Sequence, residues 1–104
     1  MINEFTLGKT QHRGVRAEEL LGDGSIFSEA CNELEKICLN QWRETKAFET
    51  AERENVWRTL KAVDAVRHTL KQYIINGRIA AEDLRRFSEE LEKQNVRRRK
   101  SGTH

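Results

Sequence analysis

The chain has 104 residues, of which 37% are apolar and 35% charged, and its formal net charge is +2. This length allows one domain with a modest core, and the low apolar fraction leaves much of the surface to charged helix faces. No run approaches the roughly 18 apolar residues of a membrane span, and residues 1–5 lack the basic and apolar regions of a signal peptide. We therefore expect a cytoplasmic protein with no membrane partner.

Helix-breaking residues are rare in this chain. Proline is absent, and the six glycines leave residues 25–76 free of both types. Because glycine and proline interrupt helices and mark turns, this gap predicts long helices. β-Branched residues nowhere alternate with a period of two, so we expect no sheet.

The first half of the chain predicts an arm and two helices. Residues 1–14 have mixed polarity and two glycines, and we expect a flexible N-terminal arm there. A short helix over 15–21 should end at the turn-forming run Gly22-Asp23-Gly24. Ser25 suits the N-cap of a second helix over about 26–44. Its apolar stripe recurs at three- and four-residue steps and comprises Phe27, Ala30, Cys31, Leu34, Ile37, Cys38 and Trp42.

The second half predicts two more helices and a tail. Thr45-Lys46-Ala47 is the expected connection, although the lack of glycine there also allows a kink within one longer helix. A third helix should run from about 49 to 76 and end at Asn76-Gly77, because glycine adopts the left-handed conformation after a helix at little cost. A fourth helix should occupy about 80–94, followed by a basic flexible tail over 96–104.

The predicted fold is all-α: an antiparallel helical hairpin of two long helices, with a short helix before it and one after. Residues 15–95 form its single helical domain. At 1.5 Å per residue, the second helix is about 28 Å long and the third about 42 Å, so the third overhangs by roughly three turns. We expect the flanking helices to cover part of this overhang and a partner chain to cover the rest.

The third helix also predicts an interaction surface. Heptads counted from Val56 place Arg67 among apolar seam residues. The favoured interpretation is that the apolar stripe drifts to Val66, which leaves Arg67 at the rim; the alternative is a polar seam residue that restricts register or oligomeric state. Trp42 and Trp57 should stack on each other at the hairpin tip, or act as interface anchors if exposed. The predicted partner interface comprises Trp42, Trp57, Leu60, Val63, Arg67, Leu70 and Ile74.

Charge is strongly segregated along the chain. Residues 18–54 hold ten acids and four bases, residues 55–81 hold one acid and five bases, and residues 97–104 hold four bases and no acid. The favoured interpretation is that an acidic helix lies against a basic one. The alternative is a basic surface that binds a nucleic-acid backbone, although no aromatic residues are interleaved to stack on bases. The residues predicted for that role are Arg97, Arg98, Arg99 and Lys100.

No residue constellation predicts catalysis, a metal site or a cofactor. His68 has only Asp64 as a nearby carboxylate on its helix, which indicates a surface hydrogen bond, and too few other ligands surround it for a metal. Cys31 and Cys38 lie two helical turns, about 10 Å, apart, too far for a disulfide. We expect them to be reduced core residues in a protein that is not an enzyme.

Several segments resemble small helical proteins encoded in the morphogenesis regions of tailed bacteriophages. These segments are Arg16-Ala17-Glu18-Glu19-Leu20-Leu21, Trp42-Arg43-Glu44-Thr45, Arg53-Glu54-Asn55-Val56-Trp57 and Ile75-Asn76-Gly77-Arg78-Ile79-Ala80. The resemblance implies a virion-assembly, head-completion or DNA-packaging accessory protein that acts in a multimer, in the host cytoplasm or the virion. The resemblance implies no catalytic residues in this chain. A small terminase subunit is one form of this idea, but the chain lacks a clear N-terminal helix-turn-helix.

The sequence therefore predicts a non-enzymatic helical interaction module that self-associates or docks on a larger protein assembly. The alternative is a nucleic-acid-binding accessory protein that uses the C-terminal basic run. Inhibition of a host enzyme would leave no distinguishable mark in the sequence.

Overall fold

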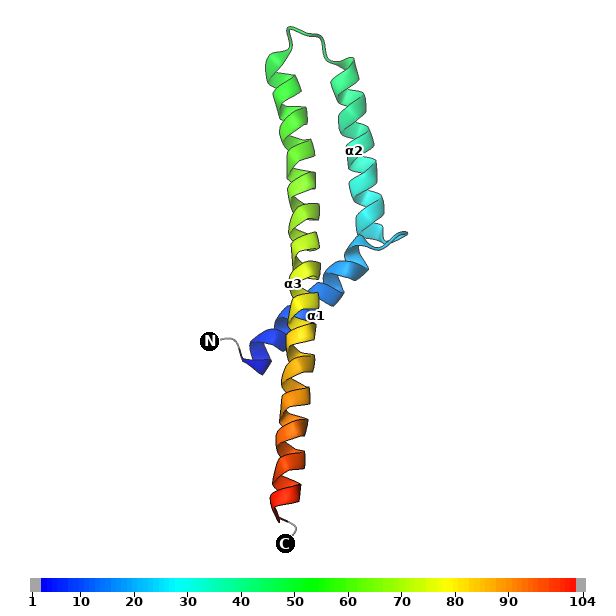
Figure 1. The fold of residues 1–104 in the computed structure, drawn as a ribbon. Helices are drawn as coiled ribbons and strands as arrows, with labels where there is room; N and C mark the ends of the chain where they lie inside the picture. The colour runs from blue at the N-terminus through cyan, green and yellow to red at the C-terminus, as the bar shows by residue number, and fades with distance from the viewer. Residues whose placement is uncertain (1–2, 103–104) are drawn as a thin grey trace.

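A computed structural model describes residues 3–102 of the chain, with side chains over 3–100. These residues form three α-helices and no strand: α1 (Glu4–Leu21), α2 (Ile26–Glu44) and α3 (Thr50–Gly102). The predicted all-α class is confirmed. α2 runs antiparallel beside the first part of α3, and α1 crosses α3 lower down (Figure 1). The last part of α3 extends past both other helices.

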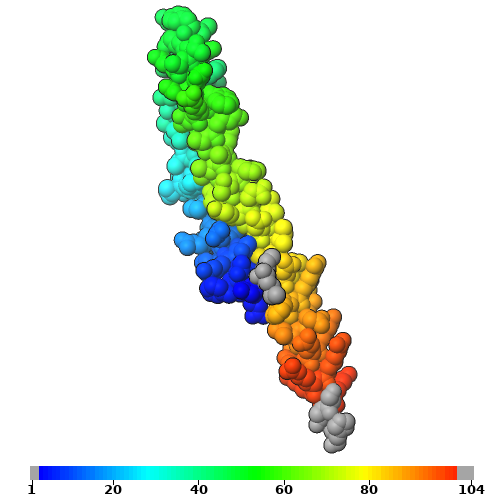
Figure 2. Space-filling model, turned by 90° about the vertical axis from the view of Figure 1, so that its left-hand side faces the viewer, coloured from blue at the N-terminus to red at the C-terminus, as the bar shows by residue number. Residues whose placement is uncertain are grey.

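The molecule is a rod. Its principal extents are 86 × 29 × 14 Å, and its radius of gyration is 23.1 Å, whereas a compact domain of this length has about 13 Å. The 53 residues of α3 account for this length, because they span about 80 Å at 1.5 Å per residue. Figure 2 shows the rod from the side, with α1 projecting from one flank of α3.

α1 begins earlier than the sequence predicted. Asn3 caps it, because its side-chain oxygen accepts a hydrogen bond of 2.8 Å from the Thr6 amide. Residues 4–14, which we expected to be an irregular arm, are therefore helical, and residues 1 and 2 of that arm lie outside the described part. The short helix predicted over 15–21 is the C-terminal end of α1.

The turn between α1 and α2 forms where the sequence predicted it. Gly24 has a φ of 78°, a left-handed value that glycine adopts without strain. The Ser25 hydroxyl accepts a 3.0 Å hydrogen bond from the Ser28 amide and donates one of 2.6 Å to the carbonyl of Leu20. Ser25 is thus the predicted N-cap of α2, and it also ties α2 to the end of α1.

The prediction that a helix ends at Asn76-Gly77 is wrong. α3 continues through Gly77, so the predicted fourth helix over 80–94 is part of α3, and the predicted flexible tail is helical as far as Gly102. Residues 103 and 104 lie outside the described part. Gly77 has a different use, because α1 crosses α3 there: a Cβ built on Gly77 would lie 2.9 Å from the Cα of Gly14. Both glycines serve close helix approach instead of helix termination.

The buried core consists of small residues. No side chain larger than valine is buried among the described residues, and the larger apolar side chains retain part of their exposure. Small side chains let helices approach closely, but each contributes little apolar area to the core. The buried apolar residues are Ala17, Cys31, Cys38, Val56, Val63 and Ala80.

Candidate interaction surfaces

Arg67 lies in the seam between α2 and α3. Its side chain is only 21% exposed, whereas the neighbouring Val66 is 48% exposed. The guanidinium donates to the carboxylate of Glu35 and, over 2.8 Å, to the side-chain oxygen of Asn32. Our expectation that Arg67 sits at the rim is therefore wrong. The helix keeps a polar residue in the seam because α2 supplies two matching acceptors.

Much of the predicted partner interface is used within the chain. Val63 is buried, and Leu60, Leu70 and Ile74 are half-buried. Ile74 faces the region that α1 covers, where it lines a shallow groove together with residues of α1. The burial of this stripe within the chain leaves less of it exposed than the sequence suggested, and its contact with a partner stays a prediction. The two tryptophans are the exposed members of the predicted set.

The rod's tip, where α2 meets α3, carries an aromatic patch. Trp42, Phe48 and Trp57 are 37%, 78% and 54% exposed. We expected the two tryptophans to stack on each other, but the structure places the Arg53 guanidinium against the Trp42 ring, 4.5 Å from its centroid. Trp42, Arg53 and Trp57 line one side of a mainly apolar hollow. We call Trp42, Phe48 and Trp57 the tip patch; Phe48 was not predicted, because it lies in a connection without periodicity.

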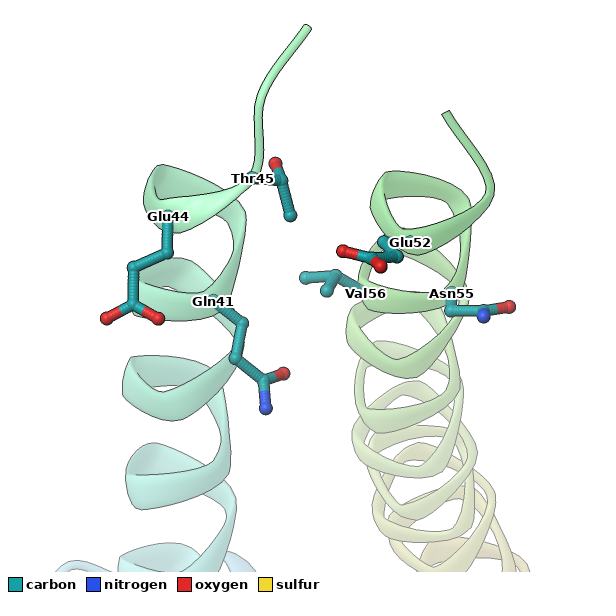
Figure 3. Close-up of a pocket in the computed structure, with 6 residues that line it drawn as sticks. All are labelled: Gln41, Glu44, Thr45, Glu52, Asn55 and Val56. Carbon is teal, nitrogen blue, oxygen red and sulfur yellow. The ribbon is translucent and has the colours of Figure 1, made fainter. Parts of the chain in front are cut away.

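A second hollow at the same tip is lined mostly by polar residues, and we call it the polar hollow (Figure 3). Val56 and Glu52 point into it from α3, Gln41 from α2 and Thr45 from the residue after α2, while Glu44 and Asn55 point away from the space between the helices. Nearby, the pKa of Glu49 is lowered, first by a hydrogen bond from the Glu52 side chain and then by the Lys46 amide, 3.1 Å away. The same contact raises the pKa of Glu52. The Glu49 carboxylate thus holds the connection just before α3, by accepting from the Lys46 amide.

The side of the rod that carries the polar hollow also carries apolar residues. Gln41 and Asn55 line the hollow from the two helices. Helical spacing places Leu34 and Ile37 on the Gln41 side of α2, and Val66 on the Asn55 side of α3. These three residues, which we call the apolar flank, are 37%, 44% and 48% exposed.

α1 crosses this same flank. Gly77 lies three turns beyond Val66, within about 20° of it around the helix, and a Cβ on Gly14 would lie 2.8 Å from the carbonyl oxygen of Tyr73 and 2.9 Å from the Cα of Gly77. Beside the crossing, an ion pair of 2.9 Å joins Arg78 of α3 to Glu18 of α1. α1 therefore divides the apolar flank from the far end of α3.

Beyond α1, α3 runs without a neighbouring helix (Figure 1). Its apolar residues continue at heptad spacing: Leu84 is half-buried, and Phe87 and Leu91 are 47% and 43% exposed. We call residues 84–100 the overhang. These exposed fractions show that Phe87 and Leu91 face solvent in the single chain.

The predicted nucleic-acid residues lie at the end of the overhang. They are exposed and helical. Because successive helical residues are rotated by about 100°, four in a row surround the helix instead of forming one basic face. Arg97 to Lys100 are therefore a basic collar at the end of the rod.

The described residues show little that could support other chemistry. Among them, no three His, Cys, Asp or Glu side chains are grouped in a way that could hold a metal ion. Cys31 and Cys38 are buried free thiols, as predicted for two small core residues. Over the same part of the chain, none of the helices combines the length and hydropathy that crossing a membrane requires.

No protein-family model, curated protein or solved structure matches this chain. Over the described residues 3–102, the structure defines an extended three-helix protein with large apolar side chains exposed along its length. The tip patch, the apolar flank and the stripe on the overhang are the three apolar surfaces considered as candidate interfaces.

Proposed function

We propose that the protein is a non-enzymatic helical interaction module that self-associates or docks on a larger protein assembly. Its working unit is a hairpin of α2 and α3, flanked by α1 and by the overhang. The resemblance to proteins of bacteriophage morphogenesis regions favours a virion-assembly or DNA-packaging accessory that acts in a multimer.

The observation that carries this proposal is the amount of exposed surface. The solvent-accessible area is 8411 Å², whereas a compact monomer of 12.2 kDa exposes about 6,000 Å². A standard protein interface removes about 800 Å² from each partner. The excess is therefore large enough for more than one interface.

The distribution of side-chain sizes supports the same function. The buried residues are small, while tryptophan, phenylalanine, leucine and isoleucine side chains remain partly exposed, both on the three surfaces and elsewhere on the rod. Because a monomer gains most from burying its largest apolar side chains, this distribution fits a chain that buries them against a partner.

Sedimentation equilibrium of the full chain at 1–200 μM tests self-association. We expect the mean mass to exceed 12.2 kDa and to rise with concentration. A monomer throughout this range, with tryptophan fluorescence of buried rings, would contradict self-association. A monomer with solvent-exposed tryptophans would leave docking on a different protein as the role of these surfaces.

A matched pair of variants then locates the contact. Ile37 and Leu39 are 44% and 48% exposed on nearly opposite sides of α2. If the apolar flank is an interface, Ile37→Ser lowers the assembled fraction, and Leu39→Ser does not. Equal effects of the two variants would point to a general loss of helix stability.

Nucleic-acid binding through the basic collar is a second candidate. It is favoured by the absence of any acid after Glu92, while Lys93 and the four collar residues are all basic. Neutralising Arg97, Arg98, Arg99 and Lys100 together should weaken binding to duplex DNA and flatten its dependence on salt concentration. Binding that is absent, or independent of salt, would remove this candidate.

A further inference from the structure

We propose that the overhang pairs with the overhang of a second copy of the chain, and that the two helices run antiparallel. This inference rests on the proposed function, and it adds the partner, the surface and the orientation.

The apolar residues of the overhang have the spacing of a helix that packs along another helix. Leu84, Phe87 and Leu91 lie three and four residues apart, so they form a single stripe on one side of α3. Spacings that alternate between three and four residues are those of a helix that packs along another helix. Leu84 and Leu91 also continue a seven-residue repeat that begins at Val56 and Val63, both of which are buried in the chain.

The opposite side of the overhang is occupied by ion pairs. Arg85 binds Glu82 and Glu89, and Arg86 lies 3.4 Å from Glu82. These residues lie on the far side of the helix from Phe87 and Leu91. The ion pairs stabilise the projecting helix and leave the apolar stripe uncovered, so another helix can pack there.

The charges along the overhang favour a second copy of the chain as the partner, in an antiparallel orientation. Residues 82–92, at and just before the start of the overhang, hold five acids and the two bases Arg85 and Arg86, a net charge of −3. Only bases follow among the charged residues of the overhang, at 93 and 97–100. A parallel pair of copies would place the two basic collars side by side, with Arg98 of each copy in the seam. An antiparallel pair places each collar beside the acids at the start of the other copy's overhang. Like charges oppose the first arrangement, and opposite charges favour the second.

One register of the antiparallel pair brings Phe87 and Leu91 of the two copies together. If Phe87 of one copy lies opposite Leu91 of the other, Leu84 lies opposite Gln94 and Asp83 lies opposite Asn95. Arg97 is then two residues, about 3 Å along the axis, from the position opposite Asp83, which is within reach of its long side chain. The ends of the pairing are set by α1, because Ala80 is only 3% exposed beneath it. The paired segment is therefore about two heptads long and ends where α1 begins to cover α3.

Sedimentation equilibrium of full-length variants tests the surface. Phe87→Ser and Leu91→Ser should each raise the dimer dissociation constant on the order of tenfold or more, because each removes an apolar side chain from the seam twice in a symmetric dimer. Ile75→Ser is the matched control, since Ile75 is 47% exposed, as is Phe87, but lies on the other side of α3. Circular dichroism should show similar helix content in all three.

A charge exchange tests the orientation. Asp83→Arg and Arg97→Asp should each weaken dimers on the order of tenfold at low salt, and the double variant should regain most of the loss. Within one chain these residues lie about 21 Å apart, so recovery requires contact between copies. Failure of the double variant to recover would overturn the antiparallel arrangement.

The outcomes separate this inference from the proposed function. A wild-type chain that associates but is insensitive to Phe87→Ser and Leu91→Ser self-associates through another surface, and only the present inference falls. A wild-type chain that remains monomeric at 200 μM overturns both the overhang pairing and self-association. If the serine variants lose helix content, the charge exchange tests the pairing instead. Recovery of the dimer in the double variant does not depend on Phe87 or Leu91.

Discussion

The crossing of α1 over α3 makes a sharp prediction about Gly14. Replacing it by alanine adds a methyl group that would lie 2.8 Å from the carbonyl oxygen of Tyr73 and 2.9 Å from the Cα of Gly77. Both are backbone atoms, so one helix must move away from the other. Overpacking of this kind costs about 1–3 kcal/mol, while alanine in place of helical glycine returns up to ~1 kcal/mol.

Gly8→Ala supplies the matched control. Gly8 lies in the same helix, and a Cβ there meets no atom within 4 Å. It should gain the helix-propensity term alone, so the two variants should differ by about 1–3 kcal/mol in unfolding free energy. At roughly 4–8 °C per kcal/mol, thermal unfolding followed by circular dichroism resolves this difference. Equal midpoints for Gly8→Ala and Gly14→Ala would show that α1 does not pack on α3 at this point.

Three further predictions concern the seam, the overhang and the whole chain. Arg67→Ala should cost about 1–3 kcal/mol in urea unfolding because it leaves Glu35 partly buried without its cation, and replacing both residues by leucine should recover the loss. The pKa of Glu82 lies below its ordinary value of 4.5, chiefly because Arg85 donates hydrogen bonds to it. The pairing of ionised Glu82 with Arg85 therefore stabilises the helix above pH 4.5, and this stabilisation is lost as the pH falls through the lowered pKa. Helix content should decrease over that pH range, and Glu82→Gln should make the decrease smaller. If assembly buries the exposed surfaces, the unfolding midpoint should rise with protein concentration, and a midpoint constant from 2 to 200 μM would argue against it.

Local signals in the sequence were sufficient for α2. Its bounds, Ile26–Glu44, follow from the Gly-Asp-Gly turn before Ser25 and from the lapse of periodicity after Glu44. The structure shows why: Ser25 caps the first turn, and the Thr45 amide donates to the carbonyls of Gln41 and Trp42 at the other end. Interactions between residues a few positions apart can be inferred from residue type alone.

The helical arm over residues 4–14 was missed although its cap, Asn3 with the Thr6 amide, is local. Two other errors arose where a distant residue decides the structure. Asn76-Gly77 has the composition of a helix end, and only the approach of Gly14, 63 positions earlier, explains why glycine lies within a continuous helix. Arg67 likewise fits the rim of a helix until Glu35 and Asn32 are placed across from it. The tip patch was predicted in part, since the tryptophans were identified as anchors if exposed, but the contact of Arg53 with the Trp42 ring depends on the geometry of the connection.

The division of residue sizes between core and surface links the fold to the proposed assembly. Pairs of small residues, such as Gly14 with Gly77, bring backbones close but bury little apolar area, so they orient helices more than they stabilise them. Several large apolar residues lie on the tip patch, the apolar flank and the overhang, while others, such as Phe5, Ile26 and Ile79, are exposed elsewhere on the rod. A rod with contacts at its tip, its side and its far end can bind several neighbours at once. This geometry suits a subunit that connects others within an assembly.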